Sequence, residues 1–118
     1  TSLLIAAVIF LSTWGLLRES LRLAMQAVPS DISLTEVEDC LGDLPGVTEV
    51  HDLHVWAMST TEIALTAHLV RPQLLNDDEL LRDAGRVLHD RFNICHTTIQ
   101  IERSVQEASC HQAGEGTL

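Results

Sequence analysis

An uncharged apolar run near the start of the chain constrains the fold more than any other feature. It covers residues 3–17 and reads LLIAAVIFLSTWGLL. A membrane-spanning helix needs about 20 predominantly apolar residues, so we interpret the run as a span that begins before Thr1. A signal-peptide core fits less well, because Arg18, Glu19 and Arg22 follow the run where a small-residue cleavage site would stand. A buried helix of a soluble protein is the remaining alternative.

The residues after this run predict the orientation of the span and a stalk. Arg18 and Arg22 follow its C-terminal end, so the positive-inside rule places the rest of the chain in the cytoplasm. Apolar residues continue at helical spacing as far as Val28, and Pro29 then breaks the pattern. We therefore assign residues 1–29 to a membrane helix and a helical stalk.

Residues 30–103 carry the periodicity of a small folded domain. A capping box at Ser33 and Glu36 opens a helix that Pro45 and Gly46 end. Alternating residues in 47–58 and 63–70 predict a β-hairpin, a second helix follows Asn76, and residues 95–102 read as a third strand. This α-β-β-α-β order predicts an α+β two-layer sandwich, with both helices on one face of a small antiparallel sheet. Residues 104–118 show no period and are assigned to a flexible tail.

Histidines and a glutamate are predicted to share the uncovered face of this sheet. Neighbouring residues on a strand point to opposite faces, which puts His68, His96 and Glu102 outward. The same rule favours His54 over His51, unless a β-bulge intervenes or the rule weakens at the start of the strand. Imidazole and carboxylate are ligands of zinc and related divalent ions. The pattern allows a metal site, with ordinary surface histidines as the alternative.

Charge and cysteine usage exclude several classes of protein. A formal net charge of −10 without a basic stripe after Arg22 argues against nucleic acid as a partner. Three cysteines without a paired spacing argue against a disulfide framework and indicate a reducing compartment. Cys40 and Cys95 are predicted to be small buried residues. Cys95 and His96 are neighbours on a strand and point apart, so they cannot act as nucleophile and base, and we expect no enzyme activity.

Five ordered segments carry a resemblance to a known family. They are RES at 18–20, PGV at 45–47, HDLHVW at 51–56, LTAHLV at 65–70 and HTTIQIE at 96–102. In order and spacing the chain, from its start to about Glu102, resembles the cation diffusion facilitators, and most closely their zinc-type bacterial efflux members. The resemblance implies that the apolar run is the last transmembrane helix of a multi-pass transporter in the cell inner membrane. It also implies a ferredoxin-like cytoplasmic domain similar in fold to copper metallochaperones.

The resemblance also implies an activity. Family members are homodimers that export Zn²⁺, or Co²⁺ and Cd²⁺ in some cases, in exchange for protons. Metal binding near the dimer interface of the cytoplasmic domain favours the transport-competent arrangement. The transport site of the family lies on earlier helices that this sequence does not include. A passive dimerisation module of the same transporter, or a membrane-tethered chaperone-like protein, remains an alternative, although the absence of a CxxC motif weighs against a chaperone.

The ligand positions of the family fall on specific residues of this chain. They are His51, His68 and, in the zinc-type subset, His96 and Glu102. Gln100 stands where some members carry a further histidine, which argues against a second adjacent site of that kind. Cys110 and His111 resemble tail ligands of some relatives, and are predicted to complete a site in the partner subunit. The resemblance thus selects His51 where strand alternation selects His54.

Overall fold

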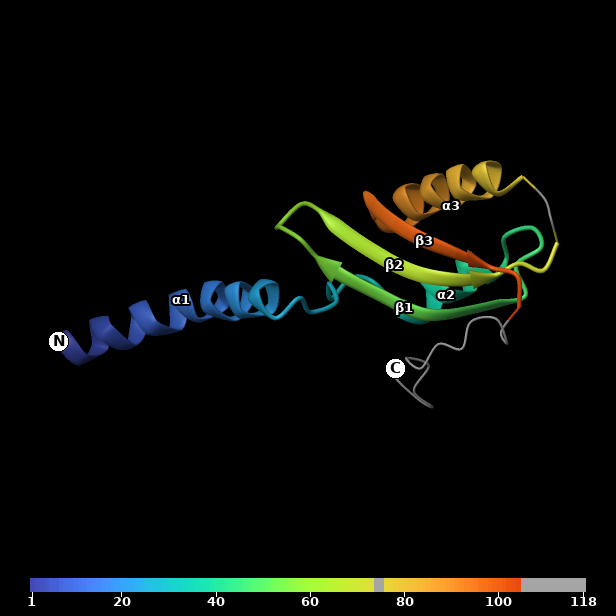
Figure 1. Ribbon diagram of the computed structural model, residues 1–118. Helices are drawn as coiled ribbons and strands as arrows, with labels where there is room; N and C mark the ends of the chain where they lie inside the picture. The colour runs from blue at the N-terminus through green and yellow to red at the C-terminus, as the bar shows by residue number, and fades with distance from the viewer. Residues whose placement is uncertain (74–75, 105–118) are drawn as a thin grey trace.

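The computed structural model describes residues 1–73 and 76–104. Within these residues, three helices and three strands follow one another as α1 (Ser2–Ala24), α2 (Leu34–Gly42), β1 (Glu49–Ala57), β2 (Ile63–Val70), α3 (Asp77–Phe92) and β3 (His96–Glu102). Helix α1 projects away from the other elements, which form one small domain (Figure 1). The predicted helix, strand, strand, helix, strand order of that domain is confirmed.

Helix α1 is long and apolar enough to cross a membrane by length and composition, and none of its residues is buried. It ends earlier than the helical spacing predicts. Gln26 adopts the left-handed conformation with φ 53°, and its N–H donates to the Leu23 carbonyl at 3.1 Å. The N–H of Ala27 donates to the Arg22 carbonyl at 3.0 Å, which completes a Schellman motif. The predicted stalk helix through Val28 is therefore wrong at its end, because this cap stops the helix before Pro29.

The three strands form one mixed sheet in the order β1-β2-β3. Strands β1 and β2 are antiparallel, whereas β2 and β3 are parallel. The predicted all-antiparallel sheet is therefore wrong for β3. Helix α3 connects β2 to β3, and a crossover helix returns the chain to the same end of the sheet from which β2 started.

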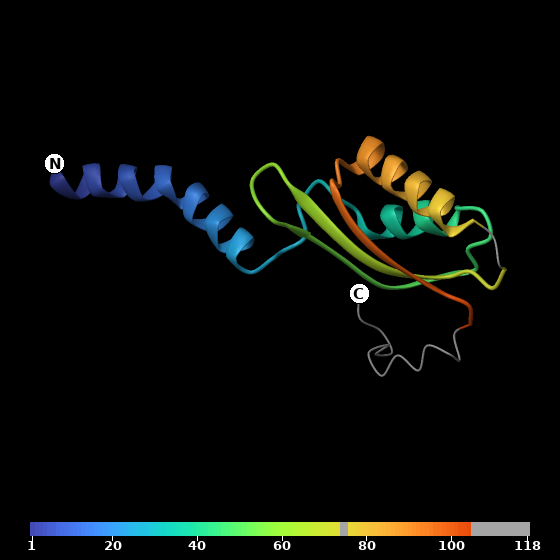
Figure 2. The same ribbon diagram turned by 45° about the horizontal axis from the view of Figure 1, so that its top comes forward.

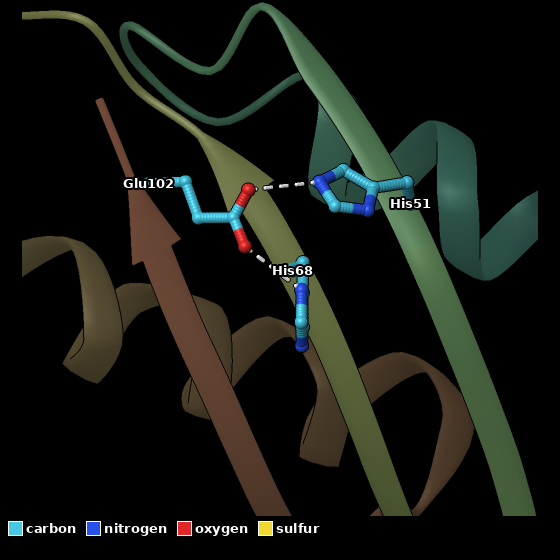
Figure 3. A group of neighbouring side chains, drawn as sticks. All are labelled: His51, His68 and Glu102. Carbon is cyan, nitrogen blue, oxygen red and sulfur yellow. Dashed lines mark hydrogen bonds and ion pairs between the residues drawn. The ribbon is translucent and has the colours of Figure 1, made fainter. Parts of the chain in front are cut away.

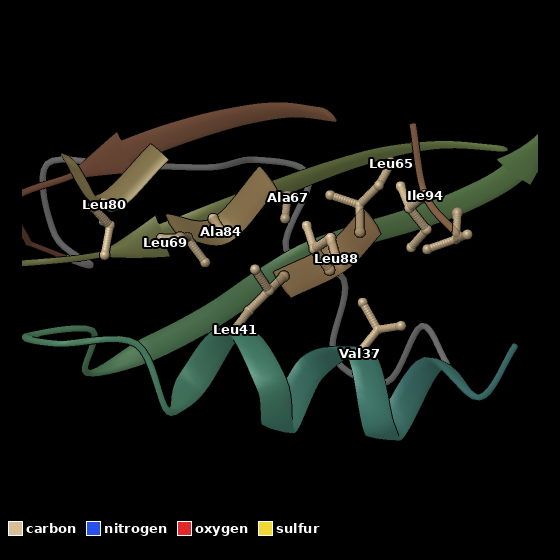
Figure 4. Close-up of a cluster of buried hydrophobic side chains, with 10 residues drawn as sticks. Val37, Leu41, Leu65, Ala67, Leu69, Leu80, Ala84, Leu88 and Ile94 are labelled. Carbon is tan, nitrogen blue, oxygen red and sulfur yellow. The ribbon is translucent and has the colours of Figure 1, made fainter. Parts of the chain in front are cut away.

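Helices α2 and α3 lie on the same face of the sheet and leave the other face uncovered (Figures 1 and 2). Fully buried side chains fill the space between the two layers (Figure 4); the largest are Val37, Leu41, Leu65, Leu69, Leu88 and Ile94. Burying one such side chain contributes about 1.5–3 kcal/mol to folding, so this layer holds the domain together. The uncovered face is therefore where polar groups can gather without disturbing the apolar layer.

Local sequence signals explain how the helices of the domain begin and end. The Ser33 hydroxyl accepts the N–H of Glu36 at 3.4 Å, which confirms the predicted N-cap of α2. Asn76 occupies the N-cap position of α3 without a side-chain cap bond, and Asn93 ends the helix in the left-handed conformation with φ 55°.

The two cysteines among the described residues differ from each other. Cys40 is buried, as predicted. The prediction that Cys95 is buried is wrong. It lies just before β3 begins, where strand alternation does not yet apply, and it is exposed.

Candidate metal centre

Three strands each contribute one side chain to a polar cluster on the uncovered face (Figure 3). His51 of β1 and His68 of β2 are direct cross-strand partners. Glu102 ends β3 and is in register with Val70, which lies two residues beyond His68 on the same face. Its carboxylate reaches between the two imidazoles. Their candidate ligand atoms all lie within 4.8 Å of one another.

A β-bulge in the first strand decides which histidine joins this cluster. The pairing register shifts between His51 and His54, and Asp52 in the bulge has φ 54°. Because two residues lie between His51 and His54, a regular strand would point them to opposite faces. The extra residue of the bulge lets both face outward. The preference for His54 from strand parity alone is corrected by this extra residue. His51 pairs with His68, whereas His54 pairs with Thr66, which lies two residues before His68 on β2.

The distances within the cluster place the carboxylate against both rings. His51 Nε2 lies 3.1 Å from Glu102 Oε2, and His68 Nδ1 lies 2.9 Å from Glu102 Oε1. The two rings meet edge to face, with their centroids 5.1 Å apart. Gln100 Nε2 donates to Glu102 Oε1 at 2.9 Å, and this hydrogen bond helps to hold the orientation of the carboxylate.

The cluster is partly shielded from water. The side chains of His51, His68 and Glu102 expose 16%, 21% and 6% of their surface. The Nδ1 atoms of both histidines are buried without a hydrogen bond, since the Glu102 oxygen near His68 Nδ1 lies outside hydrogen-bonding geometry despite its short distance. A buried polar atom without a hydrogen bond is costly, and a cation bound beside Glu102 would satisfy the Nδ1 atom of His68.

The donor set suits a divalent metal ion. Two imidazole nitrogens and a carboxylate are a common set of zinc ligands, and zinc is almost always four-coordinate in structural sites. The cluster therefore supplies three ligands, and a fourth has to come from water, another segment or a partner subunit.

An ion-pair network anchors the end of β3 that carries Glu102. The Arg71 N–H donates to the Glu102 carbonyl at 2.7 Å, and the Arg71 guanidinium is buried, where it donates to the Pro45 carbonyl at 3.2 Å and to Asp77 Oδ1 at 2.9 Å. The Arg103 guanidinium donates from Nη2 to Asp77 Oδ2, and from Nη1 to the Arg71 carbonyl at 3.1 Å. The hydrogen bond from Arg103, with a smaller contribution from Arg71, lowers the pKa of Asp77 below 3.8. This network holds the strand end in place beside β2.

The structure separates the remaining predicted ligands from the cluster. His96 lies at the opposite end of β3 from Glu102, about 20 Å away at roughly 3.3 Å per residue. It pairs with Ala64, is 52% exposed, and lies 3.9 Å from Glu62. His96 and Glu102 share a face, as predicted, but they cannot bind one ion within the same chain. Cys110 and His111 lie outside the described residues.

Two features near the cluster were not found from the sequence. Asp52 lies in the bulge, with Oδ1 3.5 Å from His54 Nε2 and Oδ2 4.0 Å from His68 Nε2. Strand alternation puts Asp52 on the same outward face as His54, but no signal in the sequence indicates the bulge that brings it beside His51 and His68. The network of Arg71, Asp77 and Arg103 joins residues far apart in the chain, and no local pattern indicates it.

Known proteins resemble this chain over most of its length. Residues 29–104 match the family model described as the cytoplasmic domain of cation efflux proteins. The metal cation efflux system protein CzcD of Cupriavidus metallidurans is 41% identical over 102 residues, which are 86% of this chain and 31% of that protein. Metal tolerance protein 1 of Oryza sativa subsp. japonica is 33% identical over 86% of this chain and 24% of its own length. The chain thus spans under a third of these relatives.

A solved structure supports the same comparison. The metal-bound C-terminal domain of the CzcD transporter is 40% identical and superimposes with a TM-score of 0.56. The match covers 60% of this chain and 99% of that domain.

Proposed function

Because this chain belongs to the cation diffusion facilitator family and carries the family's cytoplasmic domain, we propose that it senses divalent metal ions and regulates cation efflux through dimer closure. The proposed domain comprises residues 30–103, preceded by a membrane helix and linker over residues 1–29 and followed by a tail over residues 104–118. The transporter itself would exchange the metal ion for protons across the cell inner membrane. Catalysis has no part in this function.

The observation that carries this proposal is the convergence of His51, His68 and Glu102 on the uncovered face. Three strands supply one ligand each, and the Nδ1 atom of His68 is buried beside Glu102 without a hydrogen bond. A bound ion would compensate for the cost of holding these groups away from water. The solved CzcD domain is metal-bound, which supports the same role here.

Zn²⁺ is the proposed ion, with Co²⁺ and Cd²⁺ as further candidates. Imidazole and carboxylate ligands accept all three, so the donor set by itself does not choose between them. The proposed ligands are His51, His68 and Glu102. Cys110 or His111 of the tail is the proposed source of the fourth ligand, reaching a site of the partner subunit. His96 is proposed as a ligand only for a different ion, because of its distance from Glu102.

Regulation requires that the closed dimer bind the ion better than the open one. A cluster with three ligands gains affinity when closure supplies a fourth, so the incomplete site provides that difference. Shifting a dimer from about 1% to about 99% closed requires roughly a 10⁴-fold difference in affinity between the two states. The linker after the Schellman motif at Gln26 then has to transmit closure to α1.

The experiment uses the 118-residue chain in detergent micelles. Calorimetry measures zinc binding, and pulsed electron resonance measures the distance between the two protomers through a spin-labelled residue introduced at Arg82, which is exposed on α3. The sensor proposal predicts micromolar or tighter binding and a shorter distance with zinc, both weakened in His68→Ala. Binding without a change in distance would remove the regulatory role. An absence of binding would leave a passive dimerisation module.

A further inference from the structure

The bulge residue of β1 adopts a conformation that needs an explanation. Gln26, Asp52 and Asn93 are the residues other than glycine with positive φ in the described part of the chain, and Gln26 and Asn93 end helices. Asp52 alone among these three lies within a strand. The left-handed conformation is unfavourable for residues with a side chain, although aspartate tolerates it better than most. Such conformations persist where the surrounding structure holds them, and they concentrate at functional sites.

The conformation of Asp52 turns its carboxylate toward two imidazoles of the uncovered face. Oδ1 lies 3.5 Å from His54 Nε2, and Oδ2 lies 4.0 Å from His68 Nε2. In a regular strand, the residue after the outward-facing His51 would point to the covered face, into the apolar layer. The bulge therefore brings a second carboxylate to the cluster in addition to Glu102.

His68 thus has a different carboxylate beside each ring nitrogen. Its Nδ1 lies 2.9 Å from Glu102 Oε1, and its Nε2 faces Asp52. A neutral imidazole carries one N–H, and the other nitrogen offers the lone pair that binds a metal. The group that accepts the N–H therefore decides which nitrogen is the ligand.

We propose that Asp52 is a positioning residue that accepts the Nε2–H of His68 and thereby presents Nδ1 as the metal ligand. This inference rests on the proposed metal site. Metal-binding histidines commonly donate their second N–H to a carboxylate, which fixes the tautomer and ring orientation and makes the ligand more basic. The separation of 4.0 Å is longer than a hydrogen bond, so the inference requires the Asp52 carboxylate to move closer to Nε2, with or without a bound ion.

Two variants separate the side chain of Asp52 from the bulge itself. Asp52→Gly removes the carboxylate and fits positive φ without strain, so the bulge remains. Asp52→Asn keeps an oxygen acceptor and tolerates the same conformation, but removes the charge. Asp31→Asn, at an exposed position before α2, removes the same charge away from the cluster and serves as the control.

Three measurements on the full chain in detergent test the proposal. Competition with a chromophoric chelator gives the zinc affinity, and X-ray absorption gives the ligands of bound zinc. Nitrogen-15 NMR of the imidazole at a pH where His68 is neutral gives its tautomer without any metal. We expect Asp52→Gly to weaken zinc binding by about 10- to 100-fold with the same set of ligands, and Asp52→Asn to weaken it less.

The tautomer separates this inference from the proposed function. Metal-free wild-type protein should hold His68 mainly as the Nε2–H form, and Asp52→Gly should lose that preference even if zinc sensing itself fails. Unchanged tautomer and affinity in Asp52→Gly would overturn the inference. Loss of one oxygen ligand from bound zinc would overturn it as well, because Asp52 would then be a direct ligand.

Discussion

The two faces of the sheet are built from the same strands and serve opposite purposes. On the covered face, Leu65 and Leu69 are almost completely buried and pack between the sheet and its helices. On the uncovered face, their strand neighbour His68 meets His51 and Glu102. Apolar burial on the covered face stabilises the fold, whereas the polar groups on the uncovered face are arranged like the ligands of a binding site. Substitutions on the two faces should therefore separate stability from metal binding.

The largest effect is expected on the covered face. Leu69→Ala removes a fully buried side chain and should lower the free energy of unfolding by about 2–5 kcal/mol. Zinc affinity of the folded protein should change little, because Leu69 points away from the cluster. Urea denaturation followed by Trp56 fluorescence in a Trp14→Phe background measures the first quantity, and calorimetry measures the second.

Leu81→Ala on α3 is the matched control, since Leu81 is 37% exposed and should cost much less stability. If Leu69→Ala weakened zinc binding as strongly as it weakened folding, the two faces would not be independent.

His68→Ala is expected to show the opposite behaviour. It removes one of three proposed ligands, so zinc affinity should fall by more than about 100-fold, beyond the loss typical of outer-shell partners. Stability without metal should change little, because the change also removes a buried nitrogen that lacks a hydrogen bond. His89→Ala, an exposed histidine of α3, controls for the loss of an imidazole. Wild-type affinity in His68→Ala would exclude the proposed cluster.

The difference between the faces also explains what the sequence could predict. Burial leaves a periodic signature, and alternation in 63–70 together with the helical spacing of Leu80, Ala84 and Leu88 located the elements of the core. Periodicity carries no information about strand direction, so the parallel pairing of β3 was missed. The connection through α3 contained that information, because a crossover helix joins parallel strands.

The uncovered face was only partly predictable because one residue changes its register. Alternation correctly put His68 and Glu102 outward, but it put His51 inward. The bulge at Asp52 has no glycine to indicate it. The family resemblance selected His51 and so succeeded where alternation failed. Alternation put His96 on the correct face, but a shared face does not bring residues together, and the five residues between His96 and Glu102 put them at opposite ends of β3.

A smaller effect should appear at the network of Arg71, Asp77 and Arg103 that anchors the end of β3. The hydrogen bond from Arg103, and secondarily that from Arg71, lowers the pKa of Asp77 in the folded protein. A carboxyl whose pKa is lowered by folding stabilises the native state above its unfolded value near 3.8, and that contribution disappears as the pH falls through the folded pKa. Wild type should therefore be more stable than Asp77→Asn at neutral pH, and the difference should shrink below pH 3.8.

Asp78→Asn is the control for this experiment, because it removes another acidic residue from the same first turn of α3. Urea midpoints of the three proteins across the acidic range measure the effect. A difference between wild type and Asp77→Asn that stays constant with pH would mean that the ionised carboxylate does not stabilise the fold.

The smallest effect is expected for His96→Ala, which tests how the uncovered face is divided. His96 is exposed and pairs with Ala64 at the far end of the sheet, so its loss should leave both stability and zinc affinity of the cluster unchanged within error. Calorimetry beside His68→Ala gives the comparison, since both variants lose one imidazole from the same face. A marked loss of affinity would mean that the His96 end of one protomer lies against the cluster of its partner in the dimer. The site would then be shared between subunits, and the division between a binding end and a passive end of the sheet would apply to the single chain alone.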